Sequence, residues 1–259
     1  MENELKELHE KLLDMLIAFQ DFTKKHDLEF FLVGGSALGA FRHKGMIPWD
    51  DDIDIAMMRS DFEKMERAME ENDNILGKYL YSSVEKHMFP EAPIGFLYEL
   101  EEQSRRINAK IDIHPIDGVP ESSLARKVQK IASLVYYLSV YRLPVKNKGK
   151  MIRGISKIIL RLTPKALFQF YQKICKRFIT KWSVEQSENI CSLFGVQGYE
   201  QEVMPKNYVL PLKMAVFETT EFPMPGNPDA YLKRLYGNYM ELPPEEQRHP
   251  QVHYNGYRT

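Results

Sequence analysis

One stretch, residues 31–56, constrains the fold more than any other part of the chain, because it joins two short polar motifs to apolar flanks. Residues 29–33 are mostly apolar and aromatic, which predicts a buried strand. Gly34 and Gly35 end this strand, since glycine turns freely and lets a ligand come close to the backbone. Ser36 stands where a helix N-cap belongs, and helix formers follow it. The free N–H groups and positive dipole end of such a helix predict a phosphate site.

Carboxylates alternate with isoleucines in the second half of the stretch, Asp52-Ile53-Asp54-Ile55. Alternate side chains of a strand share a face, so the isoleucines can enter the core while Asp52 and Asp54 project together. Mg²⁺ suits such a pair, because it takes few protein carboxylates and completes its shell with water and phosphate oxygens. Each motif alone is usually a turn or a solvated strand end. Together they predict chemistry on a nucleoside di- or triphosphate.

The order Gly35-Ser36 followed by Asp52-x-Asp54 resembles the signature of the nucleotidyltransferase superfamily, and more narrowly the LicD family. That family includes bacterial phosphocholine transferases and the catalytic domains of fukutin-type ribitol-phosphate transferases. Three segments carry the resemblance: residues 33–39, 42–54 and 242–249. The middle of the chain, about residues 121–180, is not covered by it.

The resemblance implies an α/β fold with a nucleotidyltransferase-like mixed sheet and flanking helices, and the charge and apolar periodicity of the uncovered middle predict a basic helical insertion. We therefore divide the chain into three parts: a catalytic core at 1–120, a basic amphipathic helical insertion at 121–182, and a C-terminal part at 183–259 that completes the core. Apolar periodicity predicts the other elements. They are helices at 2–26, 59–72, 183–194 and 227–236, short strands at 79–83 and 95–100, and a hairpin at 213–225.

A second alternating stretch, residues 109–115, predicts another strand with Lys110, Asp112 and His114 on one face. The superfamily keeps a third carboxylate on a strand beside the first acidic strand, and Asp112 is its counterpart here. Asp112 would hold metal or take the proton of the attacking hydroxyl, although a simple ion pair with Lys110 is the alternative. The resemblance thus implies a site for Mg²⁺, with Mn²⁺ as the alternative, formed by Asp52, Asp54 and Asp112. The Asp117-Gly118 pair that follows predicts a turn.

The resemblance also implies a donor-binding set: Gly34, Gly35, Ser36, Arg42, Lys44 and Trp49. Arg42 and Lys44 would flank the nucleotide phosphates, or alternatively only stabilise a helix C-terminus. Trp49 would stack on a base or meet a quaternary ammonium group, with a place in the core as the alternative. The tail offers residues for an aromatic wall around choline, although packing onto the domain is the simpler interpretation: Tyr236, Tyr239, His249, His253 and Tyr254.

Charge is distributed unevenly. Residues 122–181 contain fifteen Lys and Arg and no Asp or Glu, whereas the remainder of the chain carries a net charge of −16. The basic segment also shows helical apolar stripes, which favours amphipathic helices on an anionic membrane surface over a solvated appendage. Nucleic acid is a rival anionic partner, but no recognition module accompanies the charges, so none is expected.

We expect a cytoplasmic protein for three reasons. The two cysteines have no metal spacing and suit a reduced compartment, the acidic start is not a signal peptide, and no apolar run is long enough to span a membrane. With the basic segment, this places the chain at the inner face of the cell membrane. The resemblance implies transfer of phosphocholine from CDP-choline to a hydroxyl of a teichoic-acid or lipopolysaccharide precursor. A ribitol- or glycerol-phosphate transferase, a nucleotidyltransferase proper and a non-catalytic membrane-surface protein stay open as alternatives.

Overall fold

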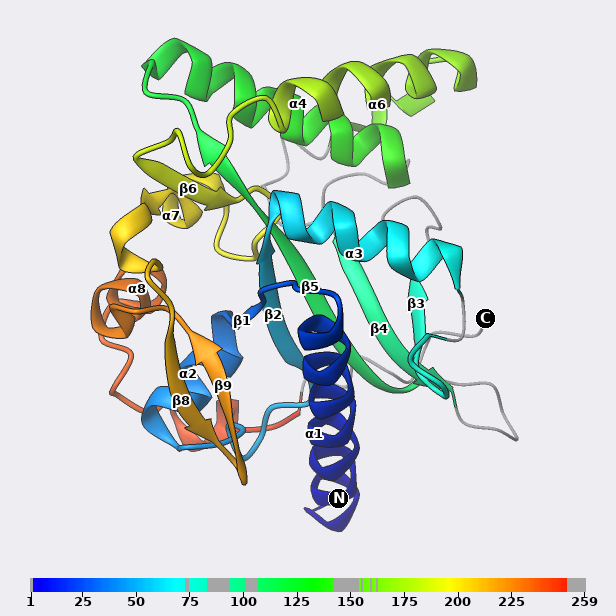
Figure 1. The fold of residues 1–259 in the computed structure, drawn as a ribbon. Coiled ribbons are helices and arrows are strands. Elements are labelled where there is room, and N and C mark those ends of the chain that lie inside the picture. The colour runs from blue at the N-terminus through cyan, green and yellow to red at the C-terminus, as the bar shows by residue number, and fades with distance from the viewer. Residues whose placement is uncertain are drawn as a thin grey trace.

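A computed structural model describes residues 2–72, 75–82, 94–100, 107–141, 154, 156–158, 160–161 and 163–250. A curled mixed sheet lies at its centre, with strand order β1-β2-β5-β4-β3, and β6 and β7 continue it from β5 (Figure 1). The strands are β1 (Phe31–Leu32), β2 (Ile53–Met58), β3 (Leu80–Ser82), β4 (Gly95–Leu100), β5 (Ile107–Val119), β6 (Asn189–Ser192) and β7 (Met204–Pro205). The predicted α/β class with a mixed sheet and flanking helices is confirmed.

The long strand β5 organises the sheet. Its first part pairs with β2 in parallel and with β4 antiparallel, and its last part pairs with β6 antiparallel. The side chains of Ile53, Ile55, Ile111 and Ile113 are fully buried, which fixes one face of β2 and β5 as the core face. The acidic residues between them therefore lie on the opposite face.

Helices cover both faces of the sheet. Figure 1 shows α1 (Glu2–Lys25) and α3 (Arg59–Glu71) across one face, where Leu16, Phe19 and Phe62 are fully buried. On the other side, α2 (Gly34–Arg42) packs against β2 and against α8 (Pro228–Tyr236), and a separate hairpin, β8 (Lys213–Phe217) and β9 (Thr220–Met224), contacts α2 and β1. The short helix α7 (Tyr199–Glu202) joins β6 to this group.

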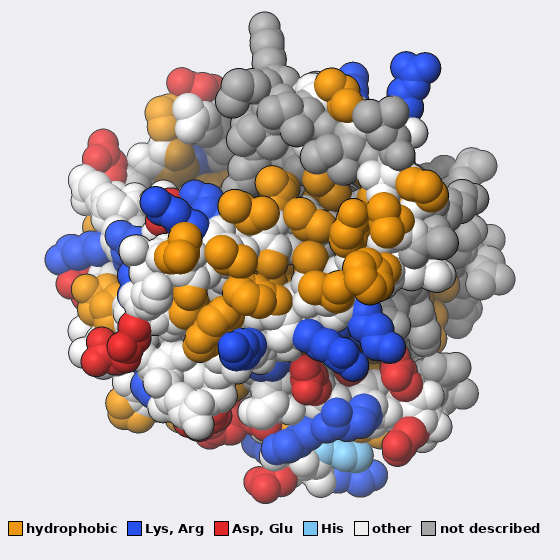
Figure 2. Space-filling view, turned by 90° about the horizontal axis from the view of Figure 1, so that it is seen from above, with side chains coloured by type: hydrophobic (Ala, Val, Ile, Leu, Met, Phe, Trp, Pro, Cys, Tyr) orange, Lys and Arg blue, Asp and Glu red, His pale blue; other side chains and the backbone are white. Residues whose placement is uncertain are grey.

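The basic segment forms helices, as predicted. In the part that the structure describes, α4 (Ser123–Tyr141) and α6 (Lys165–Ile179) pack against each other above the sheet (Figure 1). Viewed from that end, their outer surface shows a patch of hydrophobic side chains bordered along one side by Lys and Arg (Figure 2). No described helix combines the length and the hydropathy that crossing a membrane would require.

Two local predictions are wrong. Residues 183–194 form turns and then strand β6, because Ile190 and Cys191 pair with the last part of β5 and are buried there. Asp117 and Gly118 do not form a turn but continue β5, where the sheet and a buried ion pair hold them.

Candidate active site

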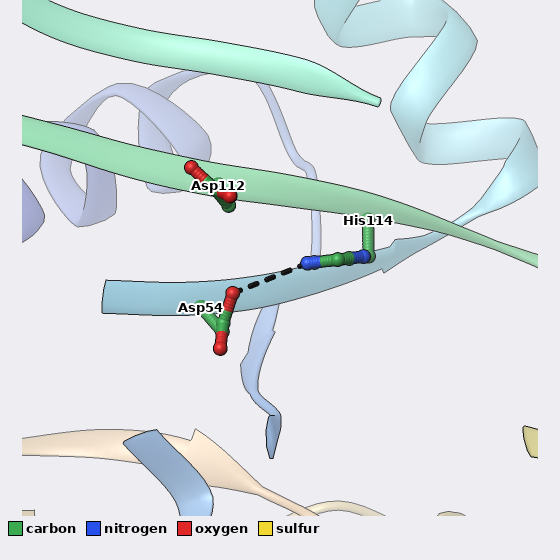
Figure 3. Close-up of side chains that lie close together, drawn as sticks. All are labelled: Asp54, Asp112 and His114. Atoms are coloured by element: carbon green, nitrogen blue, oxygen red, sulfur yellow. Dashed lines mark hydrogen bonds and ion pairs between the residues drawn. The ribbon is translucent and has the colours of Figure 1, made fainter. Parts of the chain in front are cut away.

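Strands β2 and β5 place two aspartates side by side. Their parallel register sets Asp54 opposite Asp112, and the flanking isoleucines turn both carboxylates to the polar face. His114 follows on the same face of β5, and its Nε2 lies 3.2 Å from Asp54 Oδ1. Figure 3 shows this imidazole reaching from β5 toward the carboxylate on β2. The structure thus brings together residues that the sequence separates by about sixty positions.

Two acidic groups adjoin on this face. Asp54, Asp112 and His114 offer ligand atoms that all lie within 4.8 Å of one another, and so do Asp50, Asp51 and Asp52. Asp52 therefore belongs to the second group by distance. Burial raises the pKa of Asp52 well above its usual range, and the charges of Asp54 and Asp112 raise it further, so the two groups interact.

A buried lysine accompanies the carboxylates. Lys110 is 2% exposed, and its Nζ lies 2.7 Å from Asp112 Oδ1. Burial raises the pKa of Asp112 and the charge of Asp54 adds to this effect, while Lys110 opposes it. The ion pair considered as an alternative role for Asp112 is therefore present, together with the approach of Asp112 to Asp54.

The residues present fit a hard divalent cation. Burial and the charges of Asp54 and Asp51 raise the pKa of Asp50 to about 7, so this side of the site carries more carboxylate than it can keep ionised alone. Clustered carboxylate oxygens are the donors that Mg²⁺ and Mn²⁺ prefer. His114 already contacts Asp54, so its imidazole orients that carboxylate, as partners of metal ligands commonly do.

The glycine turn does not begin its helix as predicted. Helix α2 begins at Gly34, which has φ +54°, and the extended Val33 takes the cap position that the sequence assigns to Ser36. The Ser36 hydroxyl instead accepts a hydrogen bond of 2.8 Å from the Asp54 backbone N–H. Ser36 therefore ties the start of α2 to the acidic strand.

The two glycines let the start of α2 come close to the carboxylates. A Cβ atom added at Gly34 would lie 2.9 Å from Asp54 Oδ2, and one added at Gly35 would lie 2.9 Å from Asp50 Oδ2. Side chains at these positions would therefore clash with the acidic groups. The N-terminal turn of α2, whose N–H groups favour anions, thus lies directly beside the carboxylates.

Three predicted donor-binding residues lie elsewhere. Arg42 is at the other end of α2, about 12 Å from Gly34 by the helical rise, and its Nη1 donates to the Tyr239 carbonyl at 2.6 Å. Lys44 is exposed just beyond that helix end. Trp49 is half-buried, with the Arg248 guanidinium 5.6 Å from its ring centroid. The structure does not bring these three to Asp54 and Asp112.

Sequence reasoning missed Glu202 and Tyr231. Glu202 ends α7 and is 8% exposed; burial raises its pKa to about 7, although His114 opposes the shift. The Tyr231 hydroxyl accepts the Gly34 N–H at 3.1 Å. Both line a cavity of about 70 Å³ that reaches Asp54 and His114. Glu202 lies in no periodic motif, and the periodicity of the predicted helix at 227–236 marks Tyr231 only as a core residue, so the fold alone reveals their place in the site.

Comparison with known proteins shows which part of the chain is similar to a known family and which whole proteins it resembles. Residues 27–124 match the family model described as LicD/FKTN/FKRP, nucleotidyltransferase domain. The lipopolysaccharide cholinephosphotransferase LicD of Haemophilus influenzae is 28% identical over 254 residues, which cover 92% of each chain. Uncharacterized proteins of Rickettsia prowazekii and Rickettsia typhi are 42% and 46% identical over 41 residues, which are 16% of this chain and 15% and 13% of theirs.

Proposed function

We propose that this protein, whose residues 27–124 match the LicD/FKTN/FKRP nucleotidyltransferase-domain model, transfers phosphocholine from CDP-choline to a hydroxyl of a glycan precursor, in a reaction that requires Mg²⁺. The Haemophilus influenzae relative suggests a lipopolysaccharide-type acceptor, and a teichoic-acid precursor presents the same chemistry. The observation that carries the proposal is the pair Asp54 and Asp112, set side by side before the glycine turn.

The proposed roles follow from position. Asp54 and Asp112, with Asp52 from the adjoining group, would hold the cation, which when bound neutralises charge on the diphosphate of the donor. The first turn of α2 would bind phosphate oxygens through its dipole and the N–H groups from Gly35 onward, since the Gly34 N–H already donates to the Tyr231 hydroxyl.

We assign Asp112 the role of binding the acceptor hydroxyl. Lys110 keeps this carboxylate oriented at 2.7 Å, so Asp112 can orient the hydroxyl or take its proton as it attacks the phosphorus distal to cytidine. CMP then leaves. We assign Arg42, Lys44 and Trp49 to the cytidine end of the donor, which would run along α2 away from the diphosphate, and we assign the charge of the leaving phosphate to the cation and the first turn of α2.

Product mass tests the proposal. The protein is incubated with Mg²⁺, a lipopolysaccharide or teichoic-acid precursor, and CDP-choline, CDP-ribitol or CDP-glycerol in turn. We expect CMP release with CDP-choline and an acceptor heavier by one phosphocholine. Preference for a polyol donor would reassign the headgroup, and attachment of CMP to the acceptor would make the protein a nucleotidyltransferase proper. Failure to consume any donor would contradict the enzyme assignment.

We also propose that α4 and α6 rest on the inner face of the cell membrane, where they contact its anionic lipids. Their outer surface exposes large apolar side chains at helical spacing: Leu124, Val128 and Ile131 on α4, and Leu167, Phe170 and Ile174 on α6 (Figure 2). Residues 122–181 contain only basic charges, so this surface suits a bilayer of acidic lipids. Each cation near such a bilayer adds about 1 kcal/mol of attraction.

Vesicle flotation checks this membrane proposal. The double variant Ile131→Asp/Phe170→Asp should bind anionic vesicles at least about tenfold more weakly, since both side chains lose apolar burial. Val216→Asp is the matched control, because this residue is exposed on β8, away from α4 and α6. Unmodified protein should float with acidic vesicles and not with neutral ones. Equal flotation of the double variant, or no binding to acidic vesicles, would refute the assignment.

A further inference from the structure

The cavity beside Asp54 has a defined place in the site. Its lining includes Gly34 and Asp54, which face the space assigned above to the diphosphate, and it extends from there toward β6, α7 and α8. Its volume of about 70 Å³ is several times what one water molecule needs and far below what a nucleoside needs. A donor with its diphosphate before Gly34 can therefore place only its small end here.

The lining combines acid and aromatic groups. The carboxylate of Glu202 and the rings of Phe31, Tyr231 and Tyr236 line the cavity along with aliphatic side chains, and its described lining contains neither Lys nor Arg. Tyr236 shares the cavity wall with Asp54 and Glu202, and burial together with these two charges raises the pKa of its hydroxyl. His114 also lines the cavity and opposes the pKa shift of Glu202, but its Nε2 lies 3.2 Å from Asp54 Oδ1 and is paired there. A carboxylate beside aromatic faces suits an apolar cation such as a quaternary ammonium group.

We propose that this cavity holds the trimethylammonium group of the donor, with Glu202 opposite its charge and Tyr231 and Tyr236 against its methyl groups. The inference rests on the proposed function and assigns to it the residues that select choline. Ser192 also lines the cavity, and its buried hydroxyl has no hydrogen-bond partner in the described chain. This hydroxyl could bond to a polyol headgroup instead, so CDP-glycerol is included as a competitor in the test.

Donor binding by titration calorimetry tests the cavity without requiring turnover. The dissociation constants of CDP-choline, CDP-glycerol and CMP are measured with Mg²⁺ for the unmodified protein and for Glu202→Gln and Tyr236→Leu. We expect each variant to bind CDP-choline about tenfold more weakly and CMP within twofold of the unmodified protein. The matched control is Glu200→Gln, which changes an exposed carboxylate on the same helix as Glu202. This control should retain CDP-choline binding.

The outcomes separate two failures. If the unmodified protein prefers CDP-choline but both variants bind it normally, the cavity assignment is overturned while the proposed function stands. If the unmodified protein does not prefer CDP-choline over CDP-glycerol, the proposed headgroup is wrong and the cavity inference falls with it. Thermal melting verifies that each variant folds. Because Glu202→Gln removes a charge and Tyr236→Leu removes a ring, the CDP-choline affinity of either variant that folds is enough to test the cavity assignment.

Discussion

Replacing Asp54 with Asn should lower the rate of CMP release by about 10³-fold or more, the scale seen when a preorganised charge contact is removed from an active site. Asp54 lies beside Asp112, contacts His114 and faces Gly34, so its carboxylate belongs at once to the proposed metal and phosphate sites. The substitution keeps the side-chain volume and removes one charge from a crowded acidic group. The measurement is the initial rate of CMP release at saturating CDP-choline and Mg²⁺.

Asp14→Asn serves as the control for this variant, because Asp14 is an exposed carboxylate on α1 and its loss should leave the rate unchanged. Asp112→Asn should match the loss seen for Asp54→Asn. If Asp54→Asn kept more than about a tenth of the activity while Asp52→Asn abolished it, the cation would belong to the group formed by Asp50, Asp51 and Asp52 instead.

The Asp117→Asn variant should lose about 3 kcal/mol of unfolding free energy, because it leaves the largely buried Arg59 guanidinium, whose side chain is 17% exposed, without its counter-charge. Arg59 Nε and Nη2 donate to the two carboxylate oxygens of Asp117 at 2.7 and 2.6 Å, and the Asp117 side chain is fully buried. This bidentate pair joins the start of α3 to β5. Urea unfolding followed by circular dichroism measures the change.

Asp61→Asn is the matched control for stability. Asp61 pairs with Lys64 at 3.0 Å on the same helix, but that lysine is 55% exposed, so the pair contributes about 1 kcal/mol or less. A loss for Asp117→Asn no larger than for Asp61→Asn would show that the buried pair does not hold β5 to α3.

The sequence predicted the parts of the site that local alternation encodes. Asp54 lies between buried isoleucines, as does Asp112, so the face of each strand follows from its own residues. That β2 and β5 are neighbours does not follow from alternation, and only the family resemblance suggested it. The structure then added the register that sets the two aspartates opposite each other.

Local patterns failed where distant contacts decide the conformation. Residues 183–194 contain a helix-like apolar pattern, yet pairing with the end of β5 makes residues 189–192 a strand. Gly118 looked like a turn glycine, but in β5 it allows close packing, since an added Cβ would lie 2.6 Å from the Trp182 carbonyl oxygen. Glu202 gains its place in the site only because α7 folds back beside His114.

A crystal of the protein grown with CDP-choline and Mn²⁺ tests the central claim most directly, because Mn²⁺ replaces Mg²⁺ and can be located by its anomalous scattering. We predict an anomalous peak in contact with both Asp54 and Asp112, and diphosphate density against Gly34 and Gly35 at the start of α2. A bound donor with its diphosphate away from this turn, or an anomalous peak that touches neither Asp54 nor Asp112, would contradict the account.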